Sequence, residues 1–281
     1  MQTYIVLIAC VILLLCLFFR VPVYISVFAA ALTYFLFQTG SSPAIIAQRI
    51  GGGIQSIPLL AIPFFICAGI FMNSSGVTKR IMNFCNVVTK RMTGGLGQVN
   101  VLLSTLMGGL SGSNLADAAM EAKILVPEME EKGYSKEFSS VLTATSAMIT
   151  PLIPPGIGMI LYGSIANVSI GKLFVAGIGI GVLLCISLMI MVHFISKKRG
   201  YQPATKEKQD PEEVKSAVKQ AILPLCLPIL IIGGIRIGIV TPTEAGTVAI
   251  VYALILGIIY KELKMSDVVD GLKESVATTA S

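Results

Sequence analysis

Long apolar segments separated by short polar ones run through the whole chain. Eight of them contain no charged residue: 3–19, 21–48, 50–78, 92–116, 138–171, 175–196, 220–235 and 245–260. A helix needs about 20 apolar residues to cross a bilayer, so most of these runs are long enough and the shorter ones are marginal. Because a segment in hydrocarbon must satisfy its own backbone groups, we expect the spans to be helices. The pattern predicts an all-α polytopic membrane protein.

Composition strengthens this prediction. Of the 281 residues, 54% are hydrophobic and 13% are charged, and the mean hydropathy is +0.84, which is outside the range of soluble domains. The opening segment MQTY has no positive charge and no A-x-A site follows it, so we expect a span there and not a signal peptide. The six cysteines lack C-x-x-C spacing, so neither a disulfide framework nor a zinc site is indicated. Nothing resembles a Walker A loop, so direct coupling to ATP is not expected.

The basic residues predict the orientation of the spans. They lie in short blocks between the apolar runs, so the net charge of +6 reflects topology and not a nucleic-acid partner. If the N-terminus is periplasmic, 18 of the 21 Lys and Arg residues face one side, which is then the cytoplasm, and the other three are Arg49, Lys172 and Arg236. This count holds only if residues 96–132 enter and leave on the same face. It therefore predicts a re-entrant hairpin.

Three segments outside the spans carry local signals of their own. Residues 38–53 have the composition of a loop. Residues 77–92 have apolar positions at helical spacing, which favours a helix in the cytoplasmic interface over a solvated connector. Those positions are Val77, Ile81, Phe84, Val88 and Met92. In TPTEAG, residues 241–246, Thr241 is a predicted N-cap and Glu244 completes a capping box, so we expect Glu244 to be structural.

Two of the apolar runs are broken by polar or proline-rich stretches. The first break is residues 111–114, within GGLSGSNLADAAM at 108–120, after which small residues resume a helical pattern. The second is TPLIPPGIG at 150–158, where three prolines and two glycines interrupt the helix. An ordinary proline kink is the alternative. Two neighbouring broken segments are, however, the best sequence indication of a transporter binding site.

The first break offers oxygen ligands for a cation. Ser111, Ser113 and Asn114 supply side-chain oxygens, and hard oxygen ligands of low charge suit an alkali cation such as Na⁺. The N-terminus of the following helix favours an anionic substrate. Asp117, one turn before Glu121, either caps that helix or takes part in ion or proton binding.

A weak internal repeat also points to a transporter. Shifting the chain by 220 residues aligns the segment from Pro22 with that from Pro242, chiefly by hydropathy. The two copies begin on opposite sides of the membrane, and such inverted repeats are typical of secondary transporters. On this interpretation the second copy is incomplete. We therefore expect a fragment that lacks a second hairpin and a second broken helix and does not transport alone.

Three motifs resemble one transporter family. They are GGLSGSNLADAAM at 108–120, LVPEMEEKGYSKEFSSVLTATSAMITPLIPPGIGMILYG at 125–163 and TPTEAG at 241–246. Together they resemble the large membrane subunit of a TRAP (tripartite ATP-independent periplasmic) transporter, over nearly the whole chain. The resemblance implies a Na⁺-coupled importer of organic acids, of the C4-dicarboxylate or sialic-acid type, in the bacterial inner membrane, and not an enzyme. The implied partners are a periplasmic substrate-binding protein and a small four-span membrane subunit.

The resemblance further implies an elevator-type fold, in which a transport domain built from hairpins and broken helices slides past a scaffold. The chain would then divide into six parts. They are scaffold helices (1–76), an interfacial arm helix (77–95), the hairpin and broken helix of the transport domain (96–168), a membrane helix (169–196), a cytoplasmic loop (197–219) and the start of the second inverted repeat (220–281).

Site residues follow from the resemblance by motif. One Na⁺ site would be framed by Ser111, Gly112, Ser113, Asn114, Thr150, Ile153 and Pro154. Substrate would contact Ser113, Asn114, Pro155 and Gly156. The resemblance also implies a smaller residue at position 114, so Asn114 departs from the family pattern. A second Na⁺ site and part of the substrate site would require the second hairpin, which this chain does not contain.

Two other functions compete with this one. GLSG at 109–112 fits the G-x-S-G of rhomboid-like intramembrane serine proteases, but such an enzyme needs a histidine base near the serine. The only histidine, His193, lies near the cytoplasmic end of its apolar run. An ion channel is the second alternative, because polar loops can also line a pore. A channel would conduct without a Na⁺ gradient or a binding protein.

Overall fold

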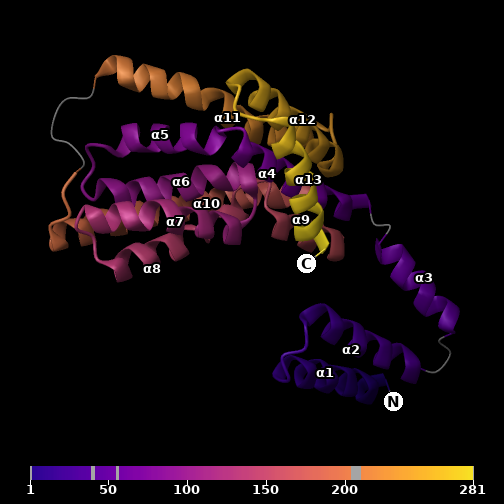
Figure 1. Ribbon diagram of the computed structural model, residues 1–281. Helices are drawn as coiled ribbons and strands as arrows, with labels where there is room; N and C mark the ends of the chain where they lie inside the picture. The colour runs from indigo at the N-terminus through magenta and orange to yellow at the C-terminus, as the bar shows by residue number, and fades with distance from the viewer. Residues whose placement is uncertain (1, 39–41, 55–56, 204–209, 281) are drawn as a thin grey trace. The chain divides into compact units, whose positions relative to one another are not determined.

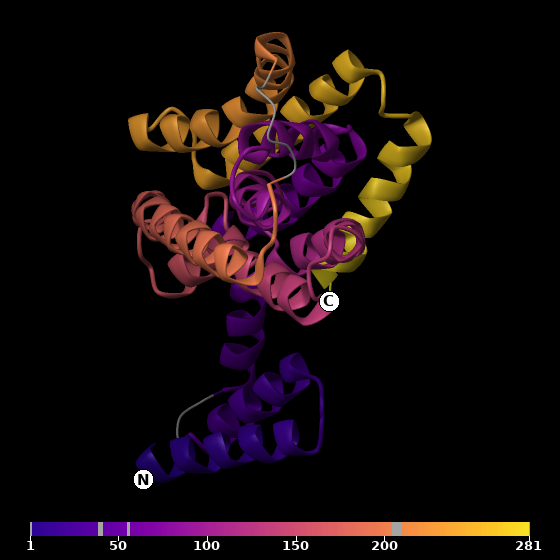
Figure 2. The same cartoon turned by 90° about the vertical axis from the view of Figure 1, so that its left-hand side faces the viewer.

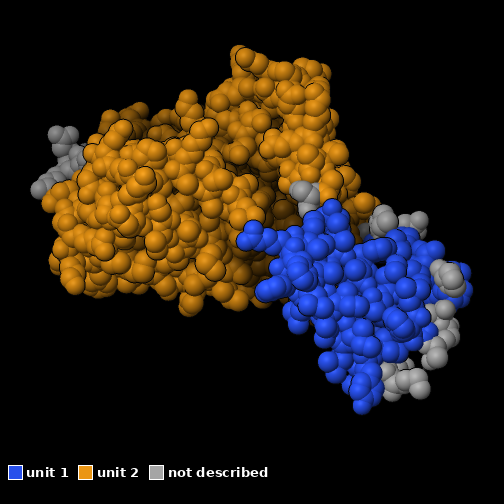
Figure 3. Space-filling view, turned by 60° about the horizontal axis from the view of Figure 1, so that its bottom comes forward, with its two compact units in different colours: residues 1–56 blue, residues 57–281 orange. Residues whose placement is uncertain are grey.

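The computed structural model describes residues 2–38, 42–54, 57–203 and 210–280. Across these ranges the regular structure is helical. The chain forms two compact units, residues 1–56 and 57–281, which are coloured separately in Figure 3. The prediction of an all-α protein is confirmed.

The described part of the first unit contains three helices. They are α1 (Gln2–Phe18), α2 (Val23–Phe37) and α3 (Pro43–Ile54). The helices α1 and α2 pack against each other, and the buried Ser26 donates a hydrogen bond to the Pro22 carbonyl at 3.1 Å. The prediction of a loop over 38–53 is wrong for residues 43–53, which are helical. Proline is tolerated in the first turn of a helix, so Pro43 starts α3 instead of preventing it.

The second unit contains ten α-helices and two short 3-10 helices among the described residues. In chain order they are η1 (Ile57–Leu60), α4 (Ala61–Ser74), α5 (Val77–Thr89), α6 (Gly95–Ser111), α7 (Asn114–Glu131), α8 (Lys136–Ser146), η2 (Thr150–Leu152), α9 (Ile157–Ile165), α10 (Ile170–Arg199), α11 (Pro211–Ile237), α12 (Pro242–Tyr260) and α13 (Met265–Ala280).

Several of these helices have the length and composition of membrane spans. The stretches 57–74, 170–199, 211–237 and 242–260 qualify singly. A fifth span results if 136–152 and 157–165, which meet at 46°, form one bent span. The apolar helices α1 and α2 are shorter, at 17 and 15 residues. The prediction of a polytopic membrane protein is therefore supported by the helices themselves.

The helix α6 lies at the centre of the second unit. It packs against α5, α7, α8 and α10, and Figures 1 and 2 show α5, α7 and α10 running alongside it. Its apolar face contributes Leu103 and Met107 to the main core, each 1% exposed. The helix α4 packs against α12 and α13. Small residues on α12 permit this approach, because a Cβ on Gly246 would lie 2.8 Å from the Phe64 Cβ.

Two predicted segments differ from the structure in their limits. The helix α5 ends at Thr89 and packs against α6 and α11, so it buries Val77, Ile81 and Cys85, while Val88 and Met92 are exposed. The loop predicted at 197–219 is also shorter. The helix α10 continues to Arg199, and α11 begins at Pro211.

Two caps, one unforeseen and one predicted, explain where helices in the second half begin. The N-cap of α11 is Asp210, whose side chain accepts a hydrogen bond from the Glu212 amide at 3.0 Å. The capping box at α12 is present as predicted. The Thr241 hydroxyl accepts from the Glu244 amide, and the Glu244 carboxylate accepts from the Thr241 amide at 2.7 Å.

Candidate functional site

The first break is a tight turn between two helices. The helix α6 ends at Ser111, Gly112 adopts a left-handed conformation with φ of 63°, and α7 begins at Asn114. The N-cap is Ser113, whose hydroxyl accepts from the Ala116 amide at 3.5 Å. The helices α6 and α7 pack together on either side of this turn, as a hairpin requires. We call residues 111–114 the hairpin tip.

The second break separates α8 from α9. Between them lie the 3-10 helix η2 and a bent stretch that includes Pro154, Pro155 and Gly156, all buried. Prolines cannot donate backbone hydrogen bonds, so the helical ladder cannot continue through this stretch. Residues 150–156 therefore form a compact turn, which we call the proline turn, and the predicted interruption is confirmed.

The hairpin tip and the proline turn lie against each other. A Cβ on Gly108 would be 2.9 Å from the backbone of Thr150, and a Cβ on Gly112 would collide with the Pro155 carbonyl oxygen. The Pro154 carbonyl oxygen also faces α6, 3.5 Å from the position of a Cβ on Gly109. Glycine is thus required where two backbones touch, and carbonyl oxygens of the proline turn point at the tip.

A carboxylate bridges the two turns. Asp117 Oδ2 accepts a hydrogen bond from Ser111 Oγ at 2.6 Å and another from Thr150 Oγ1 at 3.1 Å. Asp117 is 2% exposed and Thr150 is fully buried. Of the two roles considered for Asp117, the helix cap is wrong, because Ser113 is the cap and the Asp117 carboxylate binds the two hydroxyls. The geometry does not favour a serine protease site, since Ser111 Oγ pairs with the Asp117 carboxylate and the Ser113 amide.

The remaining predicted site residues differ in accessibility. Asn114 is exposed at the tip, whereas Pro154, Pro155 and Gly156 are buried beneath it. The side chain of Ile153 points at α10, because a Cβ on Gly181 would collide with it. Its side chain is a hydrocarbon without a ligand atom, so Ile153 can offer only its carbonyl oxygen. The oxygens at the contact belong to hydroxyls, backbone carbonyls and the Asp117 carboxylate, and hard oxygen ligands of this kind fit a hard monovalent cation.

A buried polar cluster that was not foreseen, apart from Glu121, lies along α6 away from the tip. Asn100 donates to Thr143 Oγ1 at 2.7 Å and accepts from Ser146 Oγ at 2.6 Å, and Ser104 Oγ donates to Glu121 Oε2 at 2.6 Å. These residues lie on α6, α7 and α8 and are almost completely buried. The sequence does carry one signal for this cluster, namely polar residues that recur every three or four positions along apolar helices. The cluster joins the hairpin to α8 by bonds that buried polar groups require.

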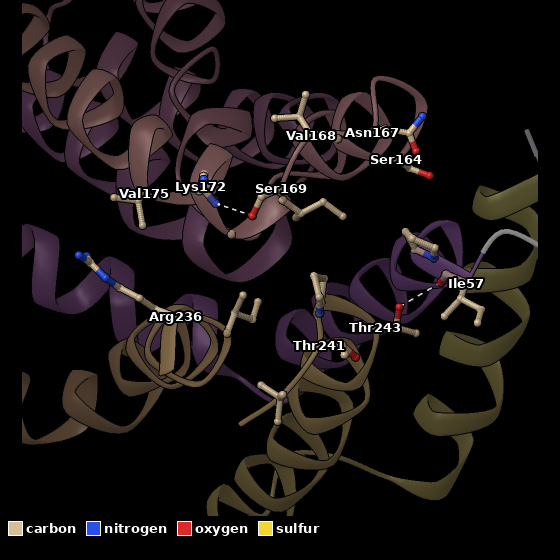
Figure 4. Close-up of a pocket in the computed structure, with 17 residues that line it drawn as sticks. Ile57, Ser164, Asn167, Val168, Ser169, Lys172, Val175, Arg236, Thr241 and Thr243 are labelled. Carbon is tan, nitrogen blue, oxygen red and sulfur yellow. Dashed lines mark hydrogen bonds between the residues drawn. The ribbon is translucent and has the colours of Figure 1, made fainter. Parts of the chain in front are cut away.

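A cavity of the second unit lies elsewhere. Its volume is about 970 Å³, and it lies between the end of α9, the start of α10, and the α11–α12 turn (Figure 4). Lys172 and Arg236 line it, and none of its 17 described lining residues is acidic. Ser169 Oγ accepts from the Lys172 amide at 3.4 Å, and Thr243 donates to the Ile57 carbonyl at 3.0 Å. None of the predicted site residues lines this cavity, so it is separate from the contact between the two turns.

Comparison with known proteins gives a consistent result. Residues 10–281 match the family model described as the tripartite ATP-independent periplasmic transporter, DctM component. The chain is 43% identical over 265 residues to the sialic acid TRAP transporter large permease protein of Vibrio cholerae, and this match covers 94% of the chain and 62% of that protein.

Two further relatives extend the comparison. Identity is 42% over 273 residues with the sialic acid TRAP transporter permease protein of Haemophilus influenzae, covering 97% of the chain and 44% of that protein. Identity is 38% over 237 residues with the 2,3-diketo-L-gulonate TRAP transporter large permease protein of Escherichia coli, and this match covers 84% of the chain and 55% of that protein. The chain thus spans between 44% and 62% of the lengths of these three relatives. All three are named as permeases of transporters, and none as an enzyme.

Proposed function

Because this chain belongs to the family of TRAP transporter large membrane subunits, the DctM component, we propose that it forms the hairpin and ion-binding part of a Na⁺-driven importer of organic acids. The observation that carries the proposal is the contact between the hairpin tip and the proline turn, where Asp117 binds Ser111 and Thr150. In a membrane, polar backbone and side chains are tolerated together only where protein, water or an ion satisfies them. Two converging turns supply that environment.

The cation and the substrate would share this contact. Hydroxyl and carbonyl oxygens of the tip and the proline turn would hold Na⁺, and Ser113, Asn114, Pro155 and Gly156 would face the substrate. The helix α7 begins at the tip, where the free amide groups of its first turn and the helix dipole favour a carboxylate. Binding of a cation would in turn favour an adjacent anion by Coulomb attraction, which is the basis of coupling.

The proposed substrate class follows from the relatives. Two of them are named for sialic acid and one for 2,3-diketo-L-gulonate, both organic acids. We place sialic acid first and C4-dicarboxylates second. A periplasmic binding protein would deliver the substrate and a small four-span subunit would support the permease. Movement of the hairpin and the proline turn past the other helices would then carry the substrate across in the elevator manner.

Uptake into vesicles tests this function. The full-length permease, its small subunit and its binding protein are reconstituted, and labelled sialic acid and succinate are offered with an inward Na⁺ or K⁺ gradient. We expect uptake that requires both Na⁺ and the binding protein, with sialic acid preferred. Uptake that is indifferent to Na⁺ would reject the proposal. Ionic conductance without a Na⁺ gradient or binding protein would identify a channel instead.

The proposed orientation places the protein in the inner membrane with a periplasmic N-terminus. It rests on the distribution of 18 of 21 basic residues to one side. In a background without native cysteines, we expect Lys172→Cys to react with a membrane-impermeant thiol reagent added outside intact cells. Lys264→Cys should react only after the membrane is opened. The reverse pattern would show that the orientation is inverted.

A further inference from the structure

The carboxylate that joins the two turns has a specific geometry. Both Ser111 Oγ and Thr150 Oγ1 donate to the same atom, Asp117 Oδ2, from two separate elements of the chain. We propose that Asp117 is a positioning residue for the cation site, which holds both hydroxyls with their oxygen lone pairs directed at the ion and is not itself a ligand. This inference rests on the proposed Na⁺-driven function.

The chemistry of a hydroxyl explains the positioning. A hydroxyl group has one proton and two lone pairs and rotates freely unless a partner fixes it. Once the proton is committed to a carboxylate, the lone pairs face away from that carboxylate and are available to a cation. A hydrogen bond to a charged acceptor is also shorter and stronger than one to a neutral acceptor. The distance of 2.6 Å between Ser111 Oγ and Asp117 Oδ2 has this character.

A competing acceptor shows what Asp117 prevents. Thr150 Oγ1 also lies 3.3 Å from the Ser104 carbonyl oxygen, slightly farther than the 3.1 Å to Asp117. Without the carboxylate, the Thr150 proton would go to that carbonyl and the hydroxyl would rotate. Ser111 would lose its acceptor altogether, and only the 3.4 Å contact from the Ser113 amide would remain. Both ligands would then be disordered with respect to the ion.

The burial of Asp117 supports a cation close by. A carboxylate that is 2% exposed loses its water, and two neutral hydroxyl donors compensate this loss only in part. A monovalent cation bound by the same two hydroxyls would lie within a few ångströms of the carboxylate and supply the missing positive charge. The carboxylate would thus stabilise the ion through space while the hydroxyl and carbonyl oxygens contact it.

The next carboxylate along α7 provides a matched control. Glu121 is fully buried and accepts from Ser104 Oγ at 2.6 Å, and its Oε1 has no hydrogen-bond partner among the described residues. The side chain bonds neither Ser111 nor Thr150. Glu121→Gln therefore removes a buried carboxylate from the same helix without releasing either proposed ligand.

The test compares the Na⁺ concentration for half-maximal uptake in the full-length permease with its partners. Asp117→Asn keeps a carbonyl oxygen that can accept both hydroxyls but loses the negative charge, so we expect a rise smaller than that of Asp117→Ala. Asp117→Ala keeps no acceptor, so we expect a rise of about 10- to 100-fold, as is typical when an outer-shell partner of a metal ligand is lost. Glu121→Gln should match the wild type. If Asp117→Ala does not fold, Asp117→Leu fills the space without an acceptor. It should show the same rise in the half-saturating Na⁺ concentration as is expected for Asp117→Ala.

Each other outcome overturns the inference in a recognisable way. If Asp117→Asn loses as much Na⁺ affinity as Asp117→Ala, the charge of the carboxylate carries the whole effect, directly or through space, and the positioning of the two hydroxyls has no role. If neither Asp117→Ala nor Asp117→Leu changes the half-saturating Na⁺ concentration while wild-type uptake is driven by Na⁺, Asp117 is only structural and the proposed function stands. Wild-type uptake that is indifferent to Na⁺ overturns the proposed function and the positioning role together.

Discussion

Replacing Gly112 by alanine is expected to reduce uptake by about 100-fold, because a displacement of about 1 Å at a reacting site can cost this much. Two effects combine at this residue. Its φ of +63° is unfavourable for a residue with a Cβ, at roughly 1–2 kcal/mol. Its Cβ would also collide with the Pro155 carbonyl, so the hairpin tip must move away from the proline turn. Uptake is measured in vesicles at equal amounts of folded protein.

A control variant separates these two effects. Gly133 has the same left-handed backbone, with φ of +84°, but no atom lies within 4 Å of the position that a Cβ would take there. Gly133→Ala should therefore lower stability by about 1–2 kcal/mol and leave uptake near the wild-type rate. If Gly112→Ala transports as well as Gly133→Ala, the close contact between the two turns has no role in transport.

Removing both bridging hydroxyls is expected to have the second large effect. Ser111→Ala combined with Thr150→Val deletes one oxygen ligand from each turn and leaves Asp117 without its two donors. We expect the half-saturating Na⁺ concentration to rise by at least about 100-fold, since loss of an outer-shell partner alone costs roughly 10- to 100-fold in metal affinity. Uptake measured as a function of Na⁺ checks this.

The matched control for the double variant also removes two hydroxyls. Among the described residues, Thr105 and Ser187 each donate to the carbonyl four residues earlier in their own helix, at 2.8 Å in both cases. Thr105→Val with Ser187→Ala should keep the wild-type dependence on Na⁺. A control that loses Na⁺ dependence as strongly as the double variant would show that the effect is general destabilisation and not loss of ligands.

The sequence predicted those parts of the site that depend on local chemistry. A glycine between two serines at 111–113 and two adjacent prolines followed by glycine at 154–156 favour a break in a helix, so both turns could be located, although single prolines such as Pro127 lie inside helices. Thr241 and Glu244 likewise form a capping box from their spacing alone. The family resemblance placed the two turns in one site, and the structure brings them into contact.

Other features could not be predicted because they depend on packing between distant segments. The bonds of Asn100 to Thr143 and Ser146 join residues more than 40 positions apart, and nothing in either segment specifies the partner. The charged start of α11 had the composition of a loop, yet its Ala217 is buried and Asp210 caps it. Similarly, the buried face of α5 was set by its neighbours α6 and α11 and not by its own apolar spacing alone.

The most direct measurement is equilibrium binding of radioactive Na⁺ to the purified full-length permease complex. The wild type should bind Na⁺ saturably, with higher affinity when a carboxylate substrate is present. The Ser111→Ala, Thr150→Val variant should bind one ion fewer per molecule, and Thr105→Val with Ser187→Ala should bind the same number as the wild type. Equal Na⁺ binding by the wild type and the Ser111, Thr150 variant would contradict a cation site between the hairpin tip and the proline turn.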